Sequence, residues 1–422
     1  MPILAVLAER MRSRLWPLPA LAAVLGVVAG LVLSLMRRGG GWWAGGWWAV
    51  DPAAARSLLQ VLAGSSLTVV ALVFSLHVVA LQLAASQYSP RLLRTYARDW
   101  VIQAALAVLI GTFAFCLVTL ATFGSAAGPP GLSVTVAVIL GLGCVGALVG
   151  VVSHIVTSLR VETMMAGLHG DAEHVIADWV DKPRASSSEQ LRAPADARLD
   201  ADRSGFVQMV DARRLVDWAS PIGALVRVEV VPGEHVLIGQ PLARVWGATQ
   251  ASVDDSGCGS AILIGFERTP DQDPALGLVQ LVDIALRALS PSLNDPTTAR
   301  HALGHMAALL VQVAAQPEGT DLVTCSEDGV PRVWRATRSL ADILDATCRP
   351  IARAGATDPD VLKALVRTLR AVGGAAGQSG AGAVRDQLAH LERCAVRGLA
   401  DEVDQRGVLA ASSEARRSLG LG

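Results

Sequence analysis

Long apolar stretches without charge dominate the first 160 residues of the chain. A helix needs roughly 18–20 residues to cross the ~30 Å hydrocarbon core of a bilayer, where it satisfies its own backbone hydrogen bonds. Four stretches reach that length without any Asp, Glu, Lys or Arg: 18–36, 61–83, 101–123 and 132–159. Four in succession argue against a buried hairpin of a soluble protein. They predict a four-helix transmembrane domain over 1–160.

Arginines in the short loops indicate how these spans are oriented, because basic residues concentrate on the cytoplasmic side. Arg37 and Arg38 follow the first span, where a signal peptide would have its small-residue cleavage site, so we interpret this span as a retained anchor. With both termini in the cytoplasm, Arg37, Arg38 and Arg56 face outward, and seven arginines face inward: Arg10, Arg12, Arg14, Arg91, Arg94, Arg98 and Arg160. The excess predicts a multi-pass protein of the bacterial inner (plasma) membrane with both termini cytoplasmic.

The second span carries polar residues at spacings of three, four and seven, which place them on one helical face. This polar stripe consists of Ser65, Thr68, Ser75, Gln82, Ser86 and Ser89. His77 lies off the stripe. Three arginines follow directly and form a candidate cytoplasmic mouth: Arg91, Arg94 and Arg98.

Two interpretations of the stripe remain open. Hydroxyl and amide groups in membrane helices commonly hydrogen-bond to neighbouring helices and hold a bundle together. Alternatively, the stripe lines a water-filled path or a pore between subunits, and the arginine mouth favours anions. Both interpretations can hold in an oligomer.

After residue 160 the apolar spans stop and shorter patterns take over. The helical pattern continues from the fourth span and passes into a flexible, Asp-, Arg-, Ser- and Pro-rich segment, so we expect a helical extension and linker over 161–203. Valines alternate with charged residues from Val226 to Val230 and predict a β-rich module over 204–263. The remainder, 264–422, predicts a helical cytoplasmic domain, broken at Pro350 and over 373–382.

Two short motifs in the β-rich segment suggest its shape. The runs Pro232-Gly233-Glu234-His235-Val236 and Gly239-Gln240-Pro241-Leu242 resemble hairpins of barrel-sandwich hybrid domains of the biotinyl and lipoyl type. That resemblance implies a small β-barrel-like module. A swinging-arm carrier needs a lysine at the hairpin tip, and none lies between Lys182 and Lys363. The module is therefore expected to serve contact or assembly.

The segment 264–304 predicts two helices joined by a capped corner. Asp283 and Arg287 stand four residues apart and can pair on a helix surface. Pro291 marks the end of that helix, and Asp295 before Pro296 is typical of an N-cap with proline at the first helical position.

Composition supports the division into two parts and leaves little room for catalysis. The chain is 52% hydrophobic, 17% charged and of net charge −1, which disfavours a cytosolic enzyme and a basic nucleic-acid binder. Residues 1–160 carry ten arginines against three acids, or +7, and the rest carries 26 basic and 34 acidic residues, or −8. The six cysteines form no Cys-x-x-Cys pair, and no phosphate loop, zinc-protease motif or nucleophile elbow occurs. We expect no cofactor, no metal and no catalytic residue, although His301 and His305 stand four apart on a predicted helix.

Three long motifs resemble a family of predicted bacterial inner-membrane proteins, domain-of-unknown-function family 2254. They are 74–91, 267–273 and 283–296, and the similarity spans roughly 10–400. The resemblance implies an integral inner-membrane protein with a cytoplasmic C-terminal part, but no reaction, ligand or catalytic residue. The polar family-motif residues in the C-terminal part are Glu267, Arg268, Asp271, Asp273, Asp283, Arg287, Asn294 and Asp295.

These observations lead to one preferred function and one alternative. The preferred function is a channel- or transporter-like component with a cytoplasmic regulatory domain. Its expected partners are the lipid bilayer and further copies of itself, and its expected cargo is a small ion or solute. The alternative is a non-conducting scaffold or sensor whose cytoplasmic part binds partners. A membrane enzyme ranks third. We also expect the acidic family-motif residues to dock beneath the arginine mouth.

Overall fold

The computed structural model describes residues 16–38, 51–87, 100–122, 131–158, 160–185, 189–255, 257–317 and 321–421. The chain divides into two compact units, Met1–Thr163 and Met164–Gly422. Each unit has its own set of elements.

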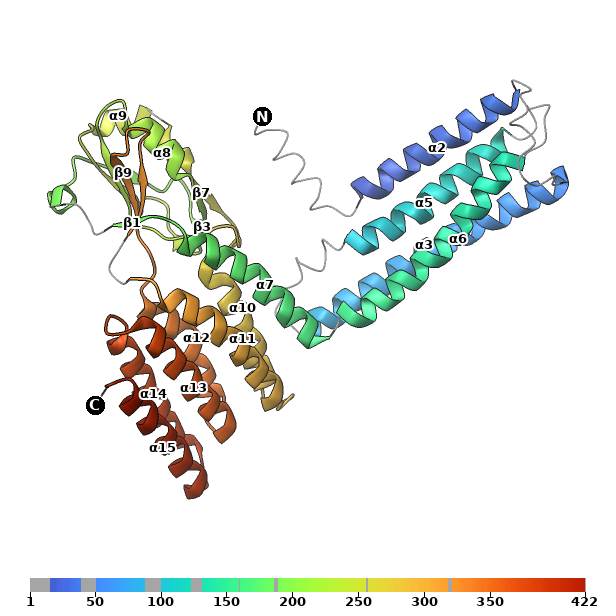
Figure 1. The fold of residues 1–422 in the computed structure, drawn as a ribbon. Helices are drawn as coiled ribbons and strands as arrows, with labels where there is room; N and C mark the ends of the chain where they lie inside the picture. The colour runs from blue at the N-terminus through green and yellow to red at the C-terminus, as the bar shows by residue number, and fades with distance from the viewer. Residues whose placement is uncertain are drawn as a thin grey trace. The chain divides into compact units, whose positions relative to one another are not determined.

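Among its described residues, the first unit contains four long helices that run side by side (Figure 1). They are α2 (Pro17–Arg38), α3 (Pro52–Gln87), α5 (Trp100–Ala121) and α6 (Gly131–Ser158). Each is long and apolar enough to cross a membrane, so the four predicted spans are confirmed as apolar helices. α3 begins well before its apolar part because Asp51 caps it, accepting from the backbone N–H groups of Ala53 (3.1 Å) and Ala54 (3.2 Å).

Glycines set the close approach of α2 and α5. A Cβ added at Gly26 would lie 2.4 Å from the carbonyl oxygen of Gly111, and one at Gly30 would lie 3.0 Å from a methyl carbon of Val118. Gly26 and Gly30 are four residues apart and therefore share one face of α2. Small residues at this spacing let membrane helices pack backbone against backbone.

One face of α3 is buried against α5 and α6. Its members recur at helical spacing: Leu59, Ala63, Ser66, Val73, His77 and Ala80. Leu59 and Ala63 pack with Phe115, Cys116 and Ala137, which belong to α5 and α6. This buried seam fixes which side of α3 faces the inside of the unit.

The second unit begins with α7 (Val161–Val180), most of which belongs to it, and its described residues form two open sheets. A six-stranded sheet has the order β1 (Arg184–Ala185), β8 (Asp321–Cys325), β9 (Pro331–Arg335), β4 (Leu225–Val228), β6 (Pro241–Trp246) and β2 (Ala197–Asp200). A three-stranded sheet has the order β5 (His235–Val236), β3 (Gly205–Val210) and β7 (Ile262–Gly265). All neighbours are antiparallel except β4 and β9.

The expected β-barrel-like module is not supported, because neither sheet closes on itself among the residues that the structure describes. The six-stranded sheet also includes four strands that we did not expect. β1 and β2 lie where we expected a linker, and β8 and β9 lie where we expected helices. The hairpin between β8 and β9 turns at Gly329, which has a φ of 77°, and the Ser326 N–H donates to the Val330 carbonyl (2.9 Å). An Asp-Gly turn between short strands is the signal that the sequence analysis missed.

The described segments between the strands also form two short α-helices and two 3-10 helices: α8 (Ala212–Ala219), α9 (Gln250–Asp255), η4 (Glu189–Arg192) and η5 (Cys258–Ala261). Six longer helices pack together beside them: α10 (Pro274–Ala288), α11 (Pro296–Ala314), α12 (Leu340–Ala354), α13 (Pro359–Ala376), α14 (Ala381–Gly398) and α15 (Glu402–Ser418). The Asp295 cap is confirmed, since its Oδ1 accepts from the backbone N–H groups of Thr297 and Thr298, both at 3.1 Å. We expected Pro350 to interrupt the helical pattern, but it lies inside α12.

Candidate functional site

The polar stripe lies on the outer surface of the first unit. Ser65, Thr68, Ser75 and Gln82 are all exposed. At about 100° per residue, Thr68, Ser75 and Gln82 lie on the far side of α3 from the buried seam, and Ser65 lies beside it. The stripe therefore does not line a path between the four helices of one copy.

Local hydrogen bonds satisfy part of the stripe. The Ser65 hydroxyl donates to the Leu62 carbonyl (3.2 Å) and the Thr68 hydroxyl to the Gly64 carbonyl (3.0 Å). Gln82 is different, because no hydrogen bond to its carboxamide is found within the described part of the chain. The described part of the stripe thus offers the Gln82 amide, the Ser75 hydroxyl and two hydroxyls that already donate to their own helix to whatever covers α3.

The other predicted residues of this region lie outside what the structure describes. Ser89, Arg91, Arg94 and Arg98 fall in the undescribed segment 88–99, and only the backbone of Ser86 is described. The arginine mouth therefore stays a prediction. His77 is 4% exposed and belongs to the buried seam.

The motif around residues 267–273 ties α10 to β3. Arg268 donates from Nε (2.8 Å) and Nη2 (2.5 Å) to the same oxygen of Asp273, whose side chain is fully buried. Burial raises the pKa of Asp273, and the neighbouring Arg268 opposes that rise. The other Asp273 oxygen caps α10 through the N–H of Ala275 (3.2 Å). A Cβ at Gly233 would lie 2.0 Å from the carboxylate, so only glycine fits beside the pair.

Gln272 completes this attachment. Its carboxamide accepts from the Val210 N–H (3.0 Å) and donates to the Val210 carbonyl (3.3 Å), which imitates a strand partner at the end of β3. Thr269 donates to the Gln208 carbonyl (3.3 Å), and Gln208 donates to the Glu267 carbonyl (2.8 Å). The motif is therefore a structural joint, and a buried Asp273 presents no charge for docking.

The remaining family-motif residues take separate positions. Hydrogen bonds from the hydroxyl and backbone N–H of Thr298 lower the pKa of Asp295, the cap of α11. Asn294 adopts a φ of 46°, which Asn tolerates better than most residues. The others lie at or near the surface: Glu267, Asp271, Asp283 and Arg287.

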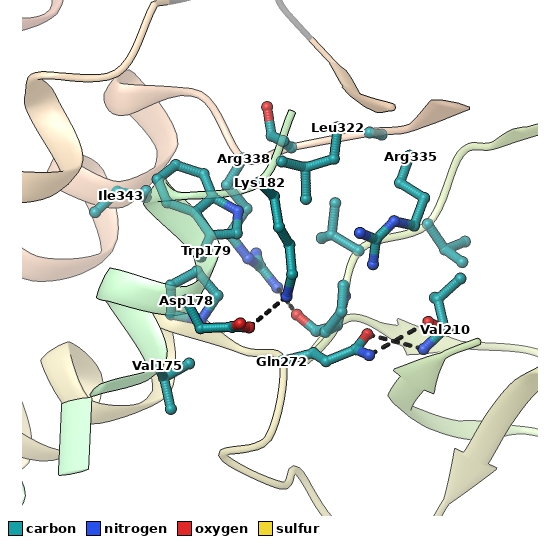
Figure 2. Close-up of a pocket in the computed structure, with 16 residues that line it drawn as sticks. Val175, Asp178, Trp179, Lys182, Val210, Gln272, Leu322, Arg335, Arg338 and Ile343 are labelled. Carbon is teal, nitrogen blue, oxygen red and sulfur yellow. Dashed lines mark hydrogen bonds and ion pairs between the residues drawn. The ribbon is translucent and has the colours of Figure 1, made fainter. Parts of the chain in front are cut away.

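A pocket that the sequence analysis missed lies among α7, β3, β9 and α12 (Figure 2). Its volume open to water-sized molecules is about 30 Å³. A second pocket of about 430 Å³ shares four lining residues with it, namely Lys182, Val210, Gln272 and Arg335. No local signal marks this site, because its lining residues run from Val175 to Ile343 and only folding brings these distant segments together.

Positive charge dominates the smaller pocket. Lys182, Arg335 and Arg338 line it, against one acid, Asp178, which pairs with Lys182. Figure 2 shows the three cationic side chains turned toward the space between them. Burial lowers the pKa of Arg335, and Asp178 opposes that effect. This arrangement can attract an anion.

Histidines of α7 and α11 face each other elsewhere in the second unit. The ring centroids of His169 and His305 are 5.1 Å apart. Burial lowers the pKa of His305, and the charges of His169 and His301 lower it further. Within the described ranges, no group of three or more His, Cys, Asp or Glu residues is arranged to hold a metal ion.

Comparison with known proteins places the chain in a family. Residues 12–371 match the family described as "Predicted membrane protein (DUF2254)". An uncharacterized protein of Mycobacterium tuberculosis is 32% identical over 424 residues, covering 96% of this chain and 81% of its own. An uncharacterized protein of Mycobacterium bovis matches to the same extent, and no solved structure matches. With four apolar helices and a match over most of its length, the chain belongs to the DUF2254 family of membrane proteins.

Proposed function

We propose that this protein is a channel- or transporter-like component of the bacterial inner membrane that works as a homo-oligomer. In this proposal the polar stripes of α3 from neighbouring copies meet and line a path for a small ion or solute. Both termini are cytoplasmic, and the second unit is a cytoplasmic regulatory domain.

The exposed position of the stripe carries this proposal. Ser65, Thr68, Ser75 and Gln82 face away from the helices of their own unit. An amide without a hydrogen-bond partner is costly in hydrocarbon, so polar groups in spans face protein or water. A second copy, or water held between copies, would satisfy Gln82.

The alternative is a non-conducting scaffold or sensor. The hydroxyls of Ser65 and Thr68 already donate to carbonyls of their own helix, which favours dry packing against another helix. In this version the stripe joins copies without water, and the second unit binds partners.

Thiol accessibility distinguishes a wet stripe from a dry one. Ser75→Cys and Gln82→Cys are introduced singly after the six native cysteines have been replaced, and each is treated with a charged, membrane-impermeant thiol reagent. We expect both to react at least tenfold faster than Phe74→Cys, an exposed apolar neighbour on the same helix. Equal, slow reaction of all three would favour the scaffold.

A further inference from the structure

The smaller pocket of the second unit holds more positive charge than its own residues neutralise. Lys182, Arg335 and Arg338 contribute three positive charges, and Asp178 contributes one negative charge. The larger pocket adds Arg213 and one further acid, which is Asp211. Asp211 caps α8 by accepting from the Arg214 N–H (3.0 Å), so that carboxylate already has a structural partner.

Arg335 is the residue whose charge is least compensated. It ends β9, and its Nε is buried without a hydrogen-bond partner. Asp178 is the acid whose charge acts on it, but Asp178 forms its ion pair with Lys182. A guanidinium placed in such surroundings is costly unless an anion pairs with it.

Neighbouring interactions hold the walls of the pocket in place. Arg184 lies over the ring of Trp179, with its guanidinium carbon 4.1 Å from the ring centroid. The Arg338 guanidinium donates to the Pro232 carbonyl (3.4 Å), and Gln272 is fixed to Val210 by two hydrogen bonds. The cationic groups therefore border a preformed space rather than a loose surface (Figure 2).

The two pockets differ in size and so suggest the shape of a ligand. The smaller one suits a compact charged group, whereas about 430 Å³ lies within the usual range for small-molecule sites. Apolar side chains line the larger space, among them Met209 and Val323. Arg335 and Lys182 border both pockets and stand where the two parts of such a ligand would join.

We propose that this site binds a small organic anion, with its phosphate or carboxylate group between Arg335, Lys182 and Arg338 and its uncharged body in the larger pocket. An arginine side chain can pair with either a phosphate or a carboxylate through two parallel hydrogen bonds. The proposal does not depend on whether the first unit conducts.

Thermal unfolding of the full-length protein tests the site. The protein is purified in a phosphate-free maltoside detergent, and its unfolding temperature is measured with phenyl phosphate, benzoate, inorganic phosphate or phenol, all at the same ionic strength set with chloride. A ligand that binds the folded state raises this temperature as its concentration rises. We expect phenyl phosphate or benzoate to raise it by about 2–4 °C at tenfold above half-saturation, and phenol to leave it unchanged.

Variants show whether the effect arises in this pocket. Arg335→Gln is expected to abolish the rise, and Lys182→Gln to reduce it, while both unfold cooperatively without ligand. The matched control is Arg332→Gln on the same strand, whose guanidinium donates to the Gly223 carbonyl (2.9 Å) outside the pocket. The proposal is overturned if no anion exceeds chloride, or if Arg335→Gln is stabilised as much as the wild type. The relative effects of phenyl phosphate and benzoate identify the acidic group.

Discussion

At the scale of single residues, the joint between Arg268 and Asp273 shows how a polar motif can be structural. Asp273 pairs with Arg268, caps α10 and requires a glycine at position 233. Breaking a buried pair by removing one partner costs more than replacing both, because a lone buried charge remains.

Arg268→Met is therefore expected to lower the free energy of unfolding by about 3 kcal/mol. Adding Asp273→Asn should recover part of that loss, since no charge is then buried and the amide oxygen can still cap α10. Denaturant unfolding of the second unit within the full chain, followed by near-ultraviolet circular dichroism, measures both. If Arg268→Met left the free energy of unfolding unchanged, the pair would contribute little to stability.

His305 gives the second residue-scale prediction. Its pKa is lower in the folded state than the ordinary value of 6.5, so the unfolded state binds more protons as the pH falls. Stability should therefore decline as the pH falls below about 6.5.

His305→Asn should flatten that decline in a thermal unfolding series from pH 7.5 to pH 5. The matched control is His174→Asn, an exposed position on α7. An unchanged pH dependence in His305→Asn would argue against any coupling between His305 protonation and folding.

At the scale of elements, helix ends and apolar spans could be predicted because their signals are local. Four uncharged stretches gave α2, α3, α5 and α6, and Asp295-Pro296 marked the start of α11. Strand pairing could not be predicted, because β4 pairs in parallel with β9, more than a hundred residues later. Pro350 lies within α12, where packing of the apolar face outweighs the missing N–H.

The glycine contact between α2 and α5 is testable at this scale. Gly26→Leu would place a side chain against the Gly111 carbonyl, so the two helices must separate. We expect a lower unfolding temperature of the first unit in detergent and faster proteolysis of α2. Gly146→Leu is the control, because a Cβ there would meet no described atom within 4 Å apart from its adjoining residues and its own helix backbone. Equal effects of the two substitutions would contradict the proposed contact.

At the scale of the whole molecule, residue patterns separated a membrane part from a mixed α/β part but could not locate the sites. The stripe was visible as a pattern in the sequence, yet only the fold shows that it lies on the outer surface of the first unit. The pocket around Arg335 had no visible pattern, because Lys182, Gln272 and Arg338 approach it from different elements. Local spacing identifies a helix face but not what covers it.

Ion flux through liposomes containing the purified protein tests whether the α3 stripe lines a conducting path. We expect chloride efflux that depends on the protein and falls at least tenfold in Ser75→Leu and Gln82→Leu, while Phe74→Leu conducts as the wild type does. The substituted proteins should reconstitute to the same density. The absence of flux of any small ion from a correctly inserted oligomer, or flux unaffected by the stripe substitutions, would contradict this proposal.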